Sequence, residues 1–185
     1  MEGHYSVAFY PSETVIAQVK GMKERLSDKV GWFHSKNSVG HITVCEFKAS
    51  DAVIEKVKQQ LTRLADGFEP VKVRLTNFGS YPNGAFFIAP DAISKSNLKP
   101  IMKRINDTLI IKNLHKSDDP HLSIARRLTP EHIETAYKMF TEIDTHFLCE
   151  SMVLRKFNET IKQFEVTDTF PFQGNPQKEI QGTLF

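Results

Sequence analysis

Two short segments of the sequence share a histidine followed two residues later by a hydroxyl side chain. The first is residues 41–44, His-Ile-Thr-Val, and the second is residues 121–124, His-Leu-Ser-Ile. Side chains at positions i and i+2 of a β-strand point to the same face. As strands, both segments would present an imidazole and a hydroxyl on one side and two apolar residues on the other. Two such strands facing each other would gather two imidazoles and two hydroxyls around one cleft.

This set of groups suits chemistry at a phosphodiester. A neutral imidazole can take a proton from an attacking hydroxyl or water, and a protonated imidazole can give one to the leaving oxygen. Hydroxyl groups can donate hydrogen bonds to the non-bridging phosphate oxygens, where negative charge grows in the transition state. We therefore expect the two segments to form the site of a phosphoesterase.

A third segment, residues 4–7, fits the same pattern. We leave His4 out of the predicted site because no loop precedes it that could shape a pocket. A histidine at the start of a strand is also commonly a half-exposed residue on a polar sheet face. The two motifs differ from this background in their placement. They lie 80 positions apart, and each opens a predicted strand that leads into a helix and then a pair of strands.

The elements around the motifs predict an α+β fold. Alternating or β-branched runs indicate strands over residues 5–10, 41–47, 71–75, 85–89, 121–125, 147–157 and 161–166. Helical spacing of apolar residues predicts helices that begin near Ser12, Ser50 or Asp51, Ser94 and Thr129. We expect two pseudo-symmetric lobes of mainly antiparallel sheet, with flanking helices around a central cleft, over residues 1–168. Residues 169–185, which contain two prolines and two glycines, are predicted to be an extended C-terminal tail.

Composition agrees with an ordinary globular protein. The 185 residues are 40% hydrophobic and 25% charged, and the net charge of +2 is too small to indicate a nucleic-acid binder by bulk electrostatics. Cys45 and Cys149 lie in apolar runs and are predicted to be free thiols, although the sequence leaves a disulfide open. The N-terminus does not resemble a signal peptide, and no stretch approaches the ~18 apolar residues of a membrane span. We therefore expect a cytoplasmic protein.

The residues around both motifs resemble the 2H phosphoesterase superfamily, the LigT-like 2′-5′ RNA ligase proteins. Residues 119–126, Asp-Pro-His-Leu-Ser-Ile-Ala-Arg, resemble its second motif, and residues 40–44 resemble its first. The resemblance covers about residues 4–168. It implies a bilobal fold with a pseudo-twofold cleft, and neither a metal nor a cofactor. It also implies a substrate that is an RNA end or small nucleotide with a 2′,3′-cyclic phosphate, or a 2′-5′ linkage.

The motif match also implies roles for individual residues. His41 and His121 would be the catalytic acid/base pair, and Thr43 and Ser123 would hydrogen-bond the phosphate. Ser123 departs from the commoner threonine but keeps the hydroxyl. Arg126 matches a residue often found after the second motif and is a candidate phosphate ligand. Strict alternation would place it on the face opposite His121, so this role requires a twist or a bulge in the strand.

Other groups could contribute to a site beside the motifs. Tyr81, Phe86 and Phe87 are candidates for stacking on a nucleobase, although the two adjacent phenylalanines must face opposite ways. The loop residues Trp32, Phe33 and His34 could form a rim of the site, and a hydrophobic anchor is an equal interpretation. A zinc site from His115, Asp118, Asp119 and His121 fits no compact ligand spacing. Phosphate-loop, dinucleotide and serine-nucleophile motifs are missing from the sequence.

The sequence thus predicts a metal-independent 2′,3′-cyclic phosphodiesterase. Two alternatives stay open: 2′-5′ RNA ligation through the same groups, and a non-catalytic nucleotide- or RNA-binding module of the same fold. The sequence does not decide which histidine is the base and which the acid. It also leaves the oligomeric state open, with a monomer as the simpler expectation.

Overall fold

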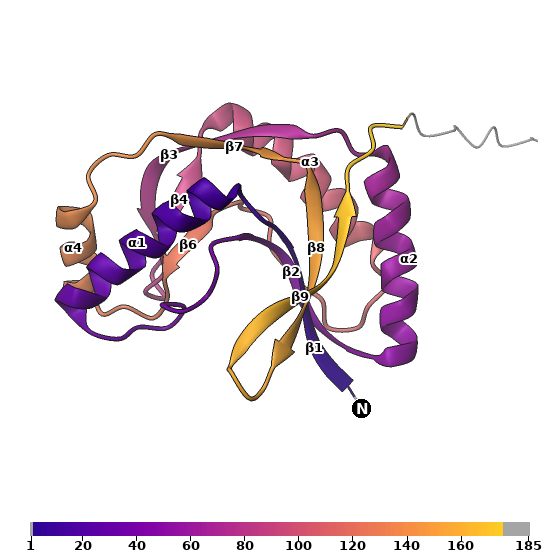
Figure 1. The fold of residues 1–185 in the computed structure, drawn as a ribbon, viewed down its shortest axis with the longest axis horizontal. Helices are drawn as coiled ribbons and strands as arrows, with labels where there is room; N and C mark the ends of the chain where they lie inside the picture. The colour runs from indigo at the N-terminus through magenta and orange to yellow at the C-terminus, as the bar shows by residue number, and fades with distance from the viewer. Residues whose placement is uncertain (1, 176–185) are drawn as a thin grey trace, which may run out of the picture.

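The strands of the computed structural model, which describes residues 2–175, form one antiparallel sheet whose middle lies at the two motifs (Figure 1). In chain order the elements are β1 Glu2–Phe9, α1 Glu13–Val30, β2 Ile42–Ser50, α2 Asp51–Gly67, β3 Val71–Ser80, β4 Phe86–Pro90, α3 Ala92–Thr108, β5 His115–Lys116, β6 Leu122–Ala125, α4 Pro130–Met139, β7 Thr145–Cys149, β8 Ser151–Asn158 and β9 Gln163–Pro171.

The sheet order explains the two halves of the molecule. The strands follow the order β7-β3-β4-β6-β2-β1-β8-β9, and the short β5 pairs with β2 outside this path. The motif strands β2 and β6 are neighbours in the middle, where Ile42 pairs with Leu122. Three further strands lie on each side of this pair. The predicted α+β fold with two halves around a centre is confirmed.

Helices α1, α2 and α4 start where they were expected, whereas α3 begins at Ala92, two residues before the predicted start near Ser94, because Asp91 caps it. The Ser12 side chain accepts a hydrogen bond from the backbone of Val15 and caps α1. Thr129 caps α4 in the same way, and Pro130 occupies the first helical position, where its missing N–H costs nothing. Helix α1 contacts α4 and β6, whereas α2 contacts β2, β8 and β9. Within residues 2–175, no helix has the length and apolar character needed to cross a membrane.

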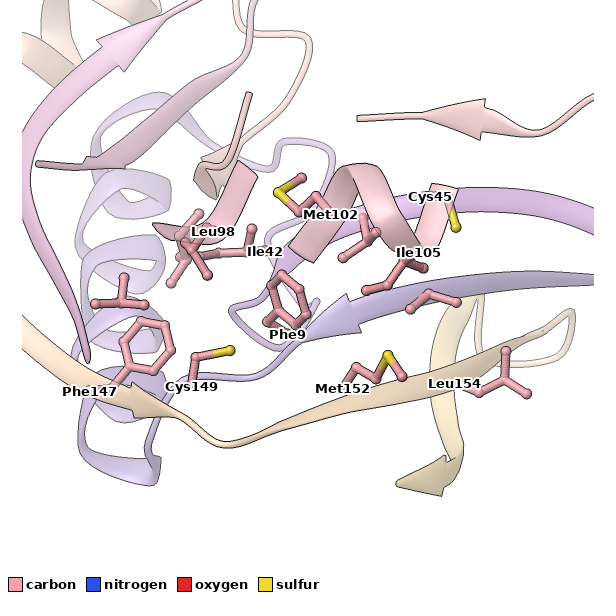
Figure 2. Packing of buried hydrophobic residues seen from close by; sticks show 14 of the residues in the cluster. Phe9, Ile42, Cys45, Leu98, Met102, Ile105, Phe147, Cys149, Met152 and Leu154 are labelled. Carbon is pink, nitrogen blue, oxygen red and sulfur yellow. The ribbon is translucent and has the colours of Figure 1, made fainter. Parts of the chain in front are cut away.

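The core lies on the sheet face opposite the motif hydroxyls. Figure 2 shows Leu98, Met102 and Ile105 of α3 gathered near Phe9 and Ile42, and all five side chains are at most 1% exposed. The apolar residue between histidine and hydroxyl in each motif is therefore the one that joins the core. This packing fixes the side to which the histidines point.

Both cysteines are buried and free, which confirms the predicted thiols. Burial raises the pKa of Cys45 and of Cys149 to about 12. Because a thiol reacts as its thiolate, neither side chain is a nucleophile near neutral pH. The cysteines contribute to packing.

The structure corrects two boundaries at the C-terminal end. Residues 147–157 were predicted as one strand, but β7 ends at Cys149 and β8 begins at Ser151, because β7 pairs with β3 and β8 pairs with β1. The predicted tail from residue 169 is also wrong in its first part. Strand β9 continues to Pro171, and Phe170 and Phe172 are buried among other core residues. The rest of the predicted tail, residues 176–185, lies outside the described residues.

Candidate active site

The two motifs form one site because their strands pair in antiparallel register. Ile42 and Leu122 are Cα partners, so continuing this register by one residue places His41 beside Ser123 and Thr43 beside His121. Both partner residues are fully buried, and their neighbours therefore face the opposite side. The two histidines and two hydroxyls all line one cleft of about 1680 Å³. Each hydroxyl belongs to one motif and lies beside the histidine of the other.

Both histidine rings are held by the same local hydrogen bond. His41 Nδ1 lies 2.6 Å from the carbonyl oxygen of Val39, and His121 Nδ1 lies 2.8 Å from that of Asp119, in both cases two residues upstream. A carbonyl oxygen can only accept, so Nδ1 carries the proton in each ring. Nε2 is then the ring nitrogen that is left to exchange a proton with a substrate.

Positive charge surrounds His41. Burial, followed by the nearby charge of Arg155, lowers the pKa of His41 to about 3, with smaller contributions from Lys23 and Arg126, while the hydrogen bond to Val39 acts in the opposite direction. The imidazole is therefore neutral near pH 7, and its Nε2 carries a free lone pair. The same cations would attract an anionic phosphate.

Lys23 shapes the loop that precedes the first motif. Its side chain on α1 is 1% exposed, and its ammonium donates to the carbonyls of Ser35 and Ser38, each at 2.8 Å, and to the Ser38 hydroxyl at 3.0 Å. Burial lowers the pKa of Lys23 to about 8. This lysine is a structural anchor, because its donors are already used by the loop that leads to Val39 and His41.

His121 is packed between aromatic rings and beside a carboxylate. The rings of Phe87 and Tyr81 lie 4.9 Å and 5.3 Å from its ring centroid. The Tyr81 hydroxyl donates to Asp119, whose other oxygen accepts from Lys95 at 3.1 Å. Although burial acts to raise it, these two hydrogen bonds hold the pKa of the Asp119 carboxyl below its usual value. These two hydrogen bonds hold Asp119 in place, and the backbone carbonyl of Asp119 orients the His121 ring.

Gly79 gives Phe87 the space for this contact. A Cβ atom at Gly79 would lie 2.6 Å from the Phe87 ring, closer than side chains approach. The two residues are cross-strand partners in the β3–β4 hairpin. The glycine therefore lets the ring lie flat over the strand and reach His121.

A β-bulge follows the hydroxyl residue in each motif. On β2, Val44 is the extra residue between the pairs Thr43–Ala8 and Cys45–Val7. On β6, Ile124 is the extra residue between the pairs Ser123–Phe87 and Ala125–Phe86. A bulge resets the alternation of side chains. As a result, the residue three positions after each hydroxyl returns to the cleft, and these residues are Glu46 and Arg126.

Arg126 lies on the cleft side of β6, whereas strict alternation along the strand would have placed it on the opposite face. It is exposed, lines the cleft and acts on the pKa of His41, and its backbone N–H donates to the carbonyl of His34 at 3.0 Å. The bulge that its predicted role required is therefore present. The hydrogen bond to His34 also joins the end of β6 to the loop before the first motif.

The aromatic candidates separate into two groups. Tyr81 lines the cleft, whereas Phe87 is buried and packs against His121 instead of lining the cleft. Phe86 was also predicted to stack on a base, and this prediction is wrong. Its side chain is fully buried on the other face, where it contacts Phe78 and Phe140 in the core. In the loop, Phe33 is buried at 4% exposure, whereas Trp32 is 67% exposed and its ring contacts that of His34.

Two buried cations near the site, Arg155 and Lys23, were not predicted from the sequence. Lys23 occupies the apolar stripe of its helix, four residues after Val19, and this position was a signal of burial. Arg155 follows four consecutive buried or half-buried residues in β8. A charged residue within such a run indicates a buried cation, but no sequence pattern indicated that it would lie near His41.

The acidic residues before the second motif do not gather into a metal site. Asp119 is engaged by Tyr81 and Lys95, and His115 lies exposed on β5. Within residues 2–175, no group of three or more His, Cys, Asp or Glu side chains is placed to hold a metal ion.

Comparison with known proteins places the chain in a family. A profile of the 2′-5′ RNA ligase superfamily matches residues 4–160. The chain belongs to this superfamily. It is 23% identical over 167 residues to the candidate phosphoesterase SH1944 of Staphylococcus haemolyticus, and the match covers 89% of this chain and 96% of that protein.

Solved structures that share the fold of this superfamily member include LigT and a Thermus protein. Escherichia coli LigT in complex with 3′-AMP has a TM-score of 0.69 at 9% identity, and the match covers 92% of this chain and 98% of that one. The protein TT0787 of Thermus thermophilus has a TM-score of 0.64 at 17% identity, with 93% and 99% covered. The fold is therefore LigT-like, as the motifs predicted.

Proposed function

We propose that the protein is a metal-independent phosphodiesterase that acts on 2′,3′-cyclic phosphate ends of RNA or of small nucleotides. The observation that carries this proposal is the pairing of β2 and β6. It places two histidines, each with Nδ1 held by a backbone carbonyl, in one cleft with two hydroxyls. This arrangement offers a proton acceptor and a proton donor to the two sides of one phosphorus atom.

His41 fits the role of general base, because its low pKa keeps it neutral and its Nε2 carries the lone pair. It would take a proton from water as the water oxygen forms a bond to phosphorus. His121 would donate a proton from Nε2 to the 3′-oxygen as the bond between that oxygen and phosphorus breaks. The product would carry a 2′-phosphate and a free 3′-hydroxyl. Thr43 and Ser123 would donate hydrogen bonds to the non-bridging oxygens.

Relatives of the same fold support a phosphate-containing ligand. E. coli LigT has been solved with 3′-AMP and also with phosphate. These ligands belong to LigT, and for this chain they support the proposal through the shared fold. Arg126, which reaches the cleft after the bulge in β6, is proposed to add a third donor to the phosphate.

Hydrolysis of a mononucleoside 2′,3′-cyclic phosphate in the presence of EDTA tests the proposal. We expect turnover to the 2′-phosphate, identified by ³¹P NMR. His41→Ala and His121→Ala should each lower kcat by ~10²–10⁴-fold, since this is the usual contribution of general acid–base catalysis. His146→Ala, at an exposed position on β7, is the matched control.

Four results would contradict the proposal. Loss of wild-type activity in EDTA would indicate a metal. Unchanged turnover in both motif variants would exclude the histidine mechanism. Nucleotide binding without turnover would point to a binding module, and joining of RNA ends without hydrolysis would point to the ligase.

A further inference from the structure

A row of planar side chains runs along the cleft from His41 towards the β8–β9 hairpin. The His41 ring lies 6.2 Å from that of Tyr10, and the Arg155 guanidinium lies 5.9 Å from the Tyr10 centroid. Arg155 also lies 5.0 Å from the ring of Phe164. All four side chains line the same cleft. Each of these planar groups thus neighbours the next one, from His41, the proposed general base, to Phe164 on β9.

The far end of the row is an aromatic platform on the hairpin. Phe157 of β8 and Phe164 of β9 are cross-strand partners with ring centroids 5.2 Å apart. The His4 ring lies 5.0 Å from Phe164 and 5.8 Å from Phe157. All three rings are partly exposed, unlike the aromatic side chains of the core. Rings that line a cleft and keep an accessible face can stack on nucleobases.

Arg155 is a buried cation whose hydrogen bonds are incomplete. It is 2% exposed, its Nη2 donates to the hydroxyl of Ser6 at 2.7 Å, and the Tyr10 side chain is a further hydrogen-bond partner. Its Nε has no hydrogen-bond partner, and within residues 2–175 it forms no salt bridge with a carboxylate. Lys23, by contrast, uses its donors on three loop oxygens. A buried guanidinium without a salt-bridge partner is suited to receive an anion or to stack on a planar group.

Charged residues of both signs lie beside the row. Lys48 and Lys162 line the cleft, and Lys162 forms an ion pair with Glu159. Glu2 and Glu46 also line the cleft, and the Glu46 carboxylate lies 3.5 Å from His4 Nε2. Burial lowers the pKa of Arg155, while Tyr10 and Glu46 act in the opposite direction. The guanidinium Nε is the donor that is left without a hydrogen-bond partner.

We propose that this row binds the nucleotides adjacent to the reacting end of a single-stranded RNA. This inference rests on the proposed function, which supplies the reacting end at His41 and His121. Bases stack on Phe164 and Phe157, and Arg155 contacts a phosphate of the chain between them and the scissile phosphate. The preferred substrate is then an oligonucleotide, and a mononucleoside cyclic phosphate occupies only the catalytic end of the cleft.

Two substrates with the same reactive end test the inference. One is a mononucleoside 2′,3′-cyclic phosphate, and the other is a tetranucleotide that ends in the same group. We expect kcat/KM of the wild type to favour the tetranucleotide. In Phe164→Leu this preference should fall about tenfold, because one base–aromatic stack is lost. Tyr137→Leu is the matched control, since Tyr137 is 40% exposed on α4 and lies outside the cleft.

A binding measurement separates this inference from the proposed function. The affinity of the tetranucleotide with a 2′-phosphate end, measured by fluorescence anisotropy, should fall in Phe164→Leu and in Arg155→Lys. Phe157→Leu replaces either variant that fails to fold. RNA binding that depends on Phe164, without hydrolysis of either substrate, would overturn the proposed function and support the row. Equal turnover of both substrates, with binding unchanged in the variants, would overturn the proposed RNA-binding role of the row. It would leave the proposed phosphodiesterase function intact.

Discussion

Ile42 and Leu122 are Cα partners in the antiparallel sheet, and this pair joins the two halves of the molecule at the centre of the candidate site. Both side chains are fully buried, so they also fix the direction of the residues on either side. Because of this register, each histidine lies beside the hydroxyl of the other motif. The cleft therefore has a pseudo-twofold arrangement. The matching bulges at Val44 and Ile124 extend this symmetry beyond the motifs.

This arrangement predicts similar losses from removal of either hydroxyl. Thr43→Val and Ser123→Ala should each lower kcat on a 2′,3′-cyclic nucleotide by roughly 10²-fold, because each removes one donor to the transition-state phosphate. Steady-state kinetics would measure the effect. Thr62→Val, at an exposed position on α2, is the control. An unchanged kcat in both motif variants would show that the hydroxyls do not contact the phosphate.

The low pKa of His41 predicts its behaviour on titration. The Cε1–H resonance of His41 should not shift between pH 5 and pH 8 in NMR spectra, because the ring stays neutral down to about pH 3. In Arg155→Met the pKa should rise, since a neighbouring positive charge is removed, and the acid limb of kcat/KM should move to higher pH. A wild-type midpoint near the usual value of about 6.5 would contradict this account.

The same shift predicts how stability depends on pH. Below about pH 6.5, His41 of the unfolded chain binds a proton that the folded protein does not accept until about pH 3. The contribution of His41 to the free energy of unfolding is therefore full above pH 6.5 and is lost as the pH falls through this window. Urea denaturation of the wild type and of His41→Asn between pH 4 and pH 7 measures the difference. An equal pH dependence in both proteins would exclude the linkage.

Lys23→Met should loosen the loop in front of the first motif. The substitution leaves the carbonyls of Ser35 and Ser38 without their donor, and we expect the free energy of unfolding to fall by roughly 2–4 kcal/mol. Limited proteolysis should also cut residues 31–40 faster than in the wild type. Lys20→Met, at an exposed position of the same helix, should behave like the wild type. Equal stability of the two variants would show that the anchor is dispensable.

Phe172→Ala tests the docking of the residues after β9. Phe172 is 7% exposed, and its ring contacts those of Phe68 and Phe9 at 5.4 Å and 6.3 Å. Truncation should cost about 3 kcal/mol in the free energy of unfolding, since it leaves a cavity in the core. Chemical denaturation would measure this loss, with the exposed Thr169→Ala as the control. A loss no larger than that of the control would show that the Phe172 ring does not contribute to the core.

Features that depend on neighbours along the chain could be predicted from the sequence alone. The two motifs, the starts of α1 and α4, and the shared face of histidine and hydroxyl follow from period-two alternation and from capping residues. These rules need only a few adjacent residues. They were sufficient to predict the fold class and the group of residues around which the cleft forms.

Features that depend on a partner strand became visible only in the folded protein. The bulge that returns Arg126 to the cleft exists because β6 pairs with β4 in a shifted register. The opposite directions of Phe86 and Phe87 were predicted, but the pairing of β4 with β3 and β6 decided that Phe86 joins the core and that Phe87 reaches His121. Arg155 contacts Ser6 across 149 positions of sequence, and its place beside His41 follows from the pairing of β8 with β1. Such pairings depend on the packing of the whole core, because the buried apolar area that stabilises them comes from segments far apart in the chain.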